Sequence, residues 1–435
     1  MNITIHRGNQ IGGCITEITS SGGTKILIDL GHNLPEGGKP SADKYDNQDE
    51  LERLLHGVSA IFYTHPHGDH MGFEARVPKG IKQYIGATSK EMLLVLRDYM
   101  THAPKLEAEA KASYVAVRDF HTYKVGVPIY VGDGSEDKKI KVTPFYVSHS
   151  AADAYMLLVE CDNKSVLHTG DFREHGYRGK GLLPTIEKYI AHKGIDVLIT
   201  EGTMLGRGDE RVMSEERLQE EAFKLMSEYD NMFVMCSSVD ADRLASFHHA
   251  TAKVGRRLIV DAYQWRQMKV IEDMLGNGKG GWKYRYPCRW YYNKHRTETH
   301  ESVKTTGATF LVRNTPKFRE MIDEVYPMMN PGRTCFIYSQ FKGYVQSDHP
   351  AFQQSTYDFL HYKDWHIECL HTSGHASKET LAAVCTAVSP RSAILPIHRD
   401  AGSDFRLLAI PQELKDKVVT ESHDLSVGGI GIKCD

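Results

Sequence analysis

The sequence predicts an α/β protein in which a doubly wound α/β domain is inserted into another domain. Between residues 206 and 365, short apolar strands alternate with helical patterns, which is typical of a parallel sheet with helices on both faces. Before and after this region, strands end instead on histidine or acidic residues. Because this second pattern resumes after the insertion, we expect residues 1–205 and 366–435 to form one domain and residues 206–365 to form the inserted one.

The first segment is expected to be rich in strands. Apolar or alternating runs between turn signals predict strands at residues 2–6, 14–19, 25–30, 58–63, 128–131, 140–147, 155–161, 165–167 and 197–200. Helices are expected at residues 43–55 and 89–99. Strands in this segment repeatedly stop at an Asp, Glu or His, and strand ends are where a rigid scaffold best positions ligands.

The insertion and the tail follow different patterns. A helix capped by Ser214 opens the insertion, with Glu215 and Glu216 at the positive end of its dipole. Strands and helices then alternate at residues 232–236, 240–252, 257–260, 263–275, 309–312, 316–325, 334–338 and 350–362. In the tail, the pattern predicts a strand, a helix and a strand at residues 366–370, 378–388 and 393–395.

Composition indicates an ordinary globular protein. The 435 residues suffice for two domains, and 25% charged residues with a net charge of −3 indicate no general affinity for nucleic acid, so any basic surface must be local. We expect no signal peptide and no membrane span. Most of the eight cysteines lie in apolar runs without a C-x-x-C pair, which favours buried thiols in a reducing, cytoplasmic setting. The oligomeric state stays open, a homo-oligomer included.

Residues 64–70, Thr-His-Pro-His-Gly-Asp-His, are the most informative stretch. Three histidines and an aspartate at a strand exit predict a metal site, since neutral imidazole is the commonest protein metal ligand. His65 and His67 point the same way on extended backbone, whereas Asp69 and His70 follow a turn. This arrangement suits two adjacent ions better than one. The alternative, a surface loop with incidental metal affinity, is disfavoured by the further candidate ligands along the chain.

Those further candidates are His149, Asp171 and His398, each expected at a strand end. One ion would have three imidazole ligands, the other two imidazoles and a carboxylate, and Asp171 could bridge them. The two sets are His65, His67 and His149, and Asp69, His70 and His398. Imidazole and carboxylate donors without thiolate favour zinc, with manganese as a substitute. Water between two such ions has its pKa lowered to roughly 7, which predicts a hydroxide nucleophile.

These residues resemble the H-x-H-x-D-H signature of the metallo-β-lactamase fold, and Asp29, His149 and Asp171 match its other motif positions. Four further motifs look like those of β-CASP nucleases, in particular the ribonuclease J-like group and the pre-mRNA 3′-end processing endonuclease. They are Gly170-Asp171-Phe172-Arg173, Thr200-Glu201-Gly202-Thr203, Ser373-Gly374-His375-Ala376-Ser377 and Pro396-Ile397-His398. The resemblance covers almost the whole chain. It implies an αββα sandwich with a β-CASP insertion, two zinc-like ions and cleavage of phosphodiester bonds.

The resemblance also bears on the polymer. In this family the third β-CASP motif is histidine in RNA-processing members, and His398 stands there, which favours RNA over DNA. Two motifs depart from the ribonuclease J-like pattern: Arg399-Asp400 replaces Gly-Glu after His398, and Gly202 replaces the serine of Glu-Ser-Thr. These departures leave the cleavage mode and the natural substrate open.

Asp69, Glu201 and His375 are the candidate catalytic residues. If Glu201 and His375 meet, the carboxylate would fix the tautomer of the ring, which could then donate a proton to a leaving oxygen. Loops that open helices could bind phosphate through backbone N–H groups; the candidate contacts are Ser237, Ser238, Ser373, Gly374 and Ser377. Helix capping needs the same residue types and is the alternative for Ser237 and Ser238.

Residues 279–304 combine seven Lys or Arg and six aromatic residues with two acids. Charge with stacking rings is typical of a single-strand binding surface. An insertion that packs its rings at an interface has the same composition, so both interpretations stay open.

We therefore expect a metal-dependent nuclease acting on single-stranded RNA, with DNA a less favoured substrate. A hydrolase of small lactones, thioesters or cyclic nucleotides is the alternative on the same metal site, and a binding protein with a decayed site is a third. A filled set of ligand positions argues against the last.

Overall fold

The computed structural model describes residues 1–36, 39–103, 105–135, 139–207, 212–276, 288–289, 293–419 and 424–434. The chain divides into two units. Unit 1 comprises Met1–Leu34, Pro40–Arg211 and Gly374–Asp435, and unit 2 comprises Pro35–Lys39 and Val212–Ser373. Unit 2 therefore interrupts unit 1 in the sequence. No helix in the described part of the chain is both long and apolar enough to cross a membrane.

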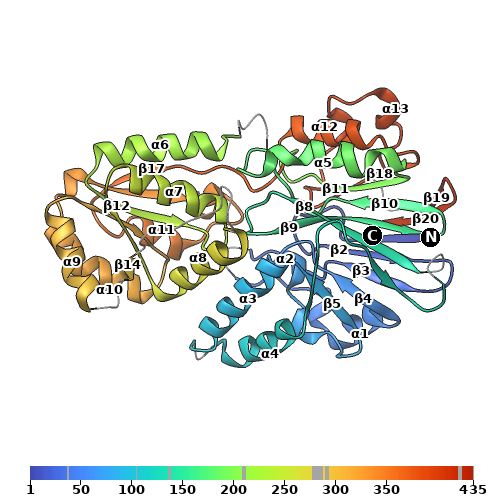
Figure 1. Ribbon diagram of the computed structural model, residues 1–435, viewed down its shortest axis with the longest axis horizontal. Coiled ribbons are helices and arrows are strands. Elements are labelled where there is room, and N and C mark those ends of the chain that lie inside the picture. Colours follow the sequence, from blue (N-terminus) through green and yellow to red (C-terminus); the bar gives the residue numbers. More distant parts are fainter. Residues whose placement is uncertain are drawn as a thin grey trace. The chain divides into compact units, whose positions relative to one another are not determined.

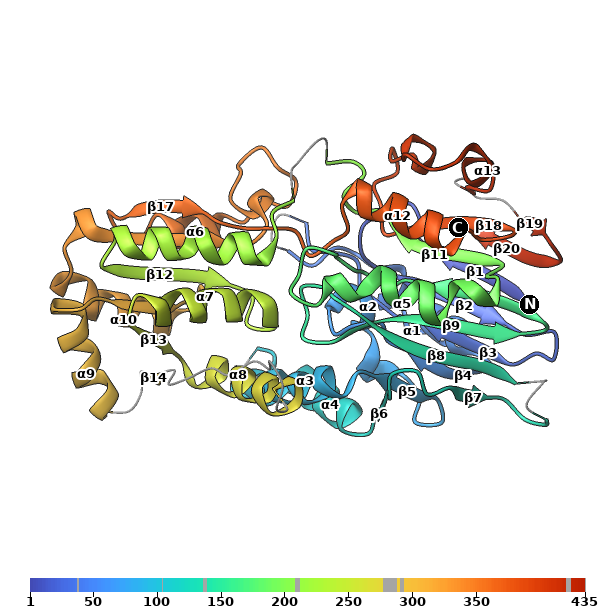
Figure 2. The same cartoon turned by 45° about the horizontal axis from the view of Figure 1, so that its top comes forward.

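Unit 1 contains two sheets. The strands of the first, in spatial order, are β19 (Asp424–Val427), β20 (Ile430–Cys434), β1 (Asn2–His6), β2 (Ile15–Thr19), β3 (Lys25–Ile28), β4 (Val58–Phe62), β5 (Lys82–Ile85) and β6 (His121–Thr122). Those of the second are β18 (Ala393–Ile397), β11 (Val197–Glu201), β10 (Lys164–His168), β9 (Ala154–Cys161), β8 (Ile140–Val147) and β7 (Ile129–Val131). The first and last segments of the chain share both sheets, and β20 lies beside β1 (Figure 2).

The two sheets pack face to face between two layers of helices (Figure 1). Ile3, Ile26 and Phe62 of the first sheet share one buried cluster with Leu157 and Ile199 of the second. A second cluster joins the outer face of the first sheet to α1 (Gln48–Leu55), α3 (Ala87–Met100) and α4 (Glu107–Arg118). A third joins the outer face of the second sheet to α5 (Leu182–Tyr189), α12 (Lys378–Val388) and α13 (Gln412–Lys415). The result is the αββα sandwich.

Unit 2 is built on a parallel sheet. Its spatial order is β14 (Cys288–Arg289), β13 (Arg257–Val260), β15 (Ala308–Leu311), β12 (Asn231–Cys236), β16 (Thr334–Ser339) and β17 (His366–Cys369), and every recorded pairing is parallel. From β12 the chain runs to β13 and then to β14 at one edge, returns to β15 between β13 and β12, and continues to β16 and β17 at the other edge. Right-handed crossovers on the two sides of β12 then place helices on opposite faces. The helices are α6 (Glu215–Glu228), α7 (Ala241–Lys253), α8 (Ala262–Leu275), α9 (Asn293–Lys304), α10 (Pro316–Val325) and α11 (Gln354–Leu360). The predicted α/β class with a doubly wound sheet is confirmed.

The strand at residues 366–370 differs from expectation. Sequence pattern assigned it to the returning first domain, but β17 pairs with β16, Cys335 opposite His366, and so belongs to the sheet of unit 2. Unit 2 consequently continues to Ser373. The two strands are separated by more than twenty residues, and the sequence of a strand does not reveal which distant strand it pairs with.

Among the helices of unit 1 with at least eight residues, α4 and α5 were not predicted. α4 buries only Ala110, Ser113 and Val117, so its apolar periodicity is weak. α5 carries Pro184 near its start, where the missing N–H costs little although proline normally signals a break.

In the basic and aromatic stretch at residues 279–304, residues 279–287 and 290–292 lie outside the described residues.

Candidate metal centre

One edge of the second sheet collects four of the predicted site residues. β10, β11 and β18 run parallel, so their carboxyl ends meet at the same edge. Asp171 follows β10, Glu201 ends β11 and His398 follows β18. β8 is antiparallel to β9 and β9 to β10, so β8 also ends at this edge, where it delivers His149. Parallel topology therefore gathers residues that lie far apart in the sequence.

The first sheet contributes the histidine-rich loop. β4 ends at Phe62, and the chain continues to His65 before α2 (Gly68–Met71) begins. His67 is the N-cap residue of α2, which carries Asp69 and His70 in its single turn. The loop is held close to the end of β3, where an added Cβ at Gly31 would lie 1.7 Å from the carbonyl oxygen of Asp69.

Three imidazoles converge in the first donor group. Nε2 of His65 lies 3.0 Å from Nδ1 of His67, which lies 3.2 Å from Nε2 of His149. These separations match the roughly 3.3 Å between nitrogen ligands on one tetrahedral ion. Burial lowers the pKa of all three imidazoles, so at neutral pH each ring is neutral and offers a lone pair.

The second donor group combines imidazoles and carboxylates. Nε2 of His398 lies 3.2 Å from Oδ2 of Asp69, and Nε2 of His70 lies 3.2 Å from Oδ2 of Asp171. Nε2 of His70 lies 3.8 Å from Oδ2 of Asp69, and Nε2 of His398 lies 3.7 Å from Oδ2 of Asp171. Nε2 of His70 and Oδ1 of Asp171 are buried without a hydrogen-bond partner. Such orphaned atoms are costly unless a further group completes them, and a divalent cation fits both donor groups.

Asp171 is placed between the two groups. Its Oδ2 lies 3.2 Å from Nε2 of His70 and 3.9 Å from Nε2 of His65. Burial would raise the pKa of Asp171, but the positive charges of His398 and His70 hold it well below its usual range. Burial likewise opposes charge on His398, yet Asp171 and other nearby negative groups raise its pKa to about 10. The carboxylates of the second donor group therefore stabilise a positive charge beside them.

Asp29 organises the loop from behind. Its Oδ2 accepts a hydrogen bond from Nδ1–H of His70 at 2.8 Å, and its Oδ1 accepts from the N–H of Thr64 at 2.7 Å. The hydroxyl of Thr64 donates to Oδ2 of Asp29 at 2.9 Å and lies 3.0 Å from Nδ1 of His65, from which it can accept. Both rings thereby turn Nε2 toward the cluster, as in carboxylate-supported metal ligands.

His149 and His398 are supported in the same way. Nδ1–H of His149 donates to the carbonyl of Gly374 at 2.6 Å, and Nδ1–H of His398 donates to Oγ1 of Thr203 at 2.7 Å. An added Cβ at Gly374 would lie 2.4 Å from Oγ of Ser150, so glycine permits this close approach. Each supporting contact leaves Nε2 as the atom that faces the cluster.

Two non-glycine residues of this site have left-handed backbone. Asp29 has φ 63° and His398 has φ 48°. Such conformations cost about 1–3 kcal/mol each and persist where the surroundings over-determine them. His398 places its ring in the second donor group and Asp29 holds the ring of His70, so both strained conformations serve to position ligands.

Glu201 and His375 meet beside Asp171. Nδ1–H of His375 donates to Oε2 of Glu201 at 3.0 Å, and Nδ1 lies 3.7 Å from Oδ2 of Asp171. Oε1 of Glu201 accepts from the N–H groups of Phe172 at 3.1 Å and Ala376 at 3.3 Å. Glu201 is fully buried, whereas the side chain of His375 is 19% exposed. The imidazole is thus held by a buried acid and open to solvent.

The candidate phosphate contacts divide between the units. Ser237, Ser238 and Ser373 belong to unit 2, whereas Gly374 and Ser377 belong to unit 1. Ser377 caps α12 by accepting from the N–H of Thr380. Asp240 rather than a serine caps α7, and Oγ of Ser237 accepts from the N–H of Val239 at 3.3 Å. Gly374 has the structural contact with His149 described above, which sequence pattern did not predict.

Sequence reasoning also missed Cys14, which it counted among the buried thiols. Cys14 precedes β2 and lies beside His70 and His398. Its neighbours Gly12 and Gly13 both have positive φ, which marks a tight turn, but an isolated cysteine there has no metal-binding spacing to reveal it.

Comparison with known proteins identifies the fold family. The sequence model of the beta-lactamase superfamily domain matches residues 24–249, more than half of the chain. The chain belongs to this superfamily. Membership in this metallo-β-lactamase superfamily implies divalent metal binding, which agrees with the two donor groups, and hydrolase activity.

Relatives narrow the likeness. The chain is 25% identical to ribonuclease J of Mycobacterium tuberculosis (strain H37Rv) over 277 residues, 61% of this chain and 45% of that protein. It is 29% identical to ribonuclease J of Mycoplasma pneumoniae over 153 residues, 34% of this chain and 23% of that protein. The chain thus aligns with less than half the length of these relatives. It is a metallo-β-lactamase-fold protein similar to ribonuclease J.

A solved structure shares the fold over nearly the entire chain. A protein of unknown function from Enterococcus faecalis V583 superposes with a TM-score of 0.67 at 20% identity, covering 91% of this chain and 93% of that one. This likeness concerns the fold alone.

Proposed function

We propose that this metallo-β-lactamase-fold hydrolase is a nuclease that cleaves phosphodiester bonds of single-stranded RNA with two divalent metal ions, zinc first among them. The proposal covers the ligand sets described above, a β-CASP role for unit 2, and RNA as partner. The observation that carries it is the position of Asp171, with one carboxylate oxygen beside both donor groups and 3.7 Å from Nδ1 of His375. The likeness to ribonuclease J supports the substrate class.

Two divalent ions in this centre would supply Lewis acidity and a hydroxide nucleophile near neutral pH. The chain's own residues orient the proton donor and supply a proton to the leaving oxygen. Glu201 accepts the Nδ1–H of His375 and so orients the ring, whose opposite nitrogen, Nε2, passes a proton to the leaving oxygen. Glu201 also accepts two backbone N–H groups through Oε1, so its carboxylate is fixed in place beside the ring.

A reducing, cytoplasmic location belongs to the same proposal. The described cysteines form no disulfide with one another, as expected for thiols kept reduced.

The test is cleavage of end-labelled RNA and of DNA with the same sequence by the full-length chain loaded with zinc or manganese. Product ladders read from each end report polymer preference and distinguish internal cutting from end-directed digestion. Asp69→Ala and His70→Ala are the inactive controls, since each removes a donor of the second group while α2 keeps its backbone contacts. We expect RNA cleavage that stops on chelation. Hydrolysis of lactones, thioesters or cyclic nucleotides without RNA cleavage would overturn the proposal in favour of a small-molecule hydrolase.

A further inference from the structure

We propose that Cys14 is a sulfur ligand of the metal position formed by Asp69, His70 and His398. The inference rests on the metal centre of the proposed function and adds a donor of a different chemical class. Imidazole and carboxylate groups alone describe a hard to borderline site, whereas a thiolate makes it soft.

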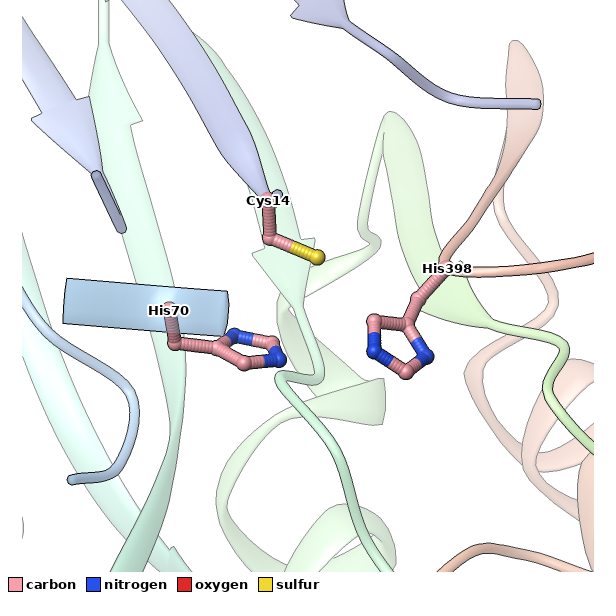
Figure 3. A group of neighbouring side chains, drawn as sticks. All are labelled: Cys14, His70 and His398. Atoms are coloured by element: carbon pink, nitrogen blue, oxygen red, sulfur yellow. The ribbon is translucent and has the colours of Figure 1, made fainter. Parts of the chain in front are cut away.

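The first support is geometric. The sulfur of Cys14 and one ring nitrogen each of His70 and His398 all lie within 4.8 Å of one another. Figure 3 shows the three side chains pointing toward a common space from three separate segments of the chain. All three are buried, with Cys14 6% exposed and each histidine 1%. Sulfur and nitrogen ligands on one tetrahedral zinc lie about 3.6 Å apart, so closing the shell needs a sulfur displacement of at most about 1 Å.

The second support is an orphaned atom aimed at the same space. Nε2 of His70 is buried and has no hydrogen-bond partner, while its Nδ1–H is committed to Asp29. A buried ring nitrogen of this kind requires a partner. A cation at this position would complete it, and the sulfur of Cys14 is within reach of that position.

The backbone ties Cys14 to the loop that carries the other ligands. Its N–H donates to the carbonyl of Asp69 at 2.8 Å, and its own carbonyl accepts from the N–H of Gly31 at 3.1 Å. Gly12 and Gly13, with φ 83° and 67°, make the turn that brings Cys14 to this place. The thiol and the histidine loop are therefore positioned as one assembly.

Ligation has a defined chemical balance and a selectivity. The S–H bond of Cys14 breaks, a sulfur–metal bond forms, and one proton leaves to solvent. A thiolate donor favours zinc, cobalt and cadmium over manganese and magnesium at this position. Manganese would then be a poor substitute here, although it suits carboxylate and imidazole donors.

Two measurements on the full chain test this inference. Extended X-ray absorption at the zinc edge should show a sulfur shell at about 2.3 Å beside the nitrogen and oxygen shell. Replacement of zinc by cobalt should produce a near-ultraviolet sulfur-to-cobalt charge-transfer band that is lost in Cys14→Ser. Cys369→Ser, at an exposed cysteine, is the matched control and should keep the band.

The outcomes separate the inference from the proposed function. A chain that takes up no zinc or cobalt would overturn the metal centre and the sulfur ligand with it. A chain that binds metal with only nitrogen and oxygen neighbours would overturn the sulfur ligand and leave the centre standing. The zinc-edge measurement uses the unmodified chain, so it decides the question even where Cys14→Ser fails to fold.

Discussion

Nδ1–H of His375 donates a hydrogen bond to Oε2 of Glu201 across 3.0 Å, joining residues 174 positions apart. Glu201 is buried and held by backbone N–H groups, and the ring of His375 is accessible on its other side. A proton donor needs this arrangement, in which a fixed carboxylate holds one nitrogen of the ring and the other side of the ring is open to substrate.

His375→Ala should slow RNA cleavage strongly with metal content unchanged. Loss of a positioned general acid costs typically about 10²–10⁴-fold in rate, and His375 is not needed to complete either donor group. Single-turnover cleavage with metal analysis of the same sample checks both halves. Metal loss from the variant would make His375 structural.

Glu201 should act through His375, so the two substitutions should not add. Glu201→Gln keeps the side-chain shape but removes the carboxylate that holds the His375 ring, so the rate should fall. The combined variant should be no slower than His375→Ala alone. Glu413→Gln, at an exposed acid of α13, should leave the rate unchanged. A fully additive loss would contradict a shared role.

Asp171→Asn should lower metal content from two ions per chain toward one. The carboxylate lies beside both donor groups, and an amide is a far weaker ligand. Metal content by mass spectrometry, with Asp119→Asn as the control at a 69% exposed side chain, measures this effect. Two ions retained in Asp171→Asn would exclude a bridging role.

Asp29→Asn should weaken metal binding about 10–100-fold without removing any direct ligand. The amide can no longer accept from both His70 and Thr64 as a charged group, so both supporting contacts weaken together. Competition with a chromophoric chelator gives the affinity, and thermal unfolding of the metal-free chains gives the stability. Unchanged affinity would show that the ring positions do not depend on this acid.

Gly31→Ala should disrupt the centre, whereas Gly68→Ala should not. An added Cβ at Gly31 would lie 1.7 Å from the Asp69 carbonyl oxygen, and the backbone must move to accept it. At Gly68, the residue before Asp69, no heavy atom lies within 4 Å of the added Cβ. We expect a lower melting temperature and lost metal only for Gly31→Ala. Equal behaviour of the two variants would contradict the close approach.

Thiol labelling should follow burial. Burial raises the pKa of the Cys236, Cys335 and Cys385 thiols to about 12, so at pH 8 about one in 10⁴ is ionised. The thiolate is the reactive form. Iodoacetamide should therefore modify exposed Cys369 well before these three, and peptide mass spectrometry follows each site. Comparable labelling of Cys385 in the native chain would show that α12 opens readily.

The histidine loop could be predicted from local sequence because its donors lie within one turn of chain. His65, His67 and His70 need no long-range contact to be neighbours. The observation that strands end on Asp, Glu or His also predicted ligands that are distant in the sequence. β10 and β18 are parallel to the same strand β11, so residues that follow them must meet at one edge. That geometry is why Asp171 and His398 could be named before their positions were known.

Tertiary structure decided how these ligands are supported and which further residues reach them. The carbonyl of Gly374 accepts from His149 across 225 positions, although the sequence suggested only an anion loop there. Cys14 reaches the second donor group by backbone hydrogen bonds to Asp69 and Gly31. Backbone carbonyls and single thiols occur throughout any chain and carry no spacing signal. The sequence by itself thus determined the class of chemistry at residues 64–70, because ligand type is a local property. Only the fold decided the supporting contacts, because they depend on packing between distant segments.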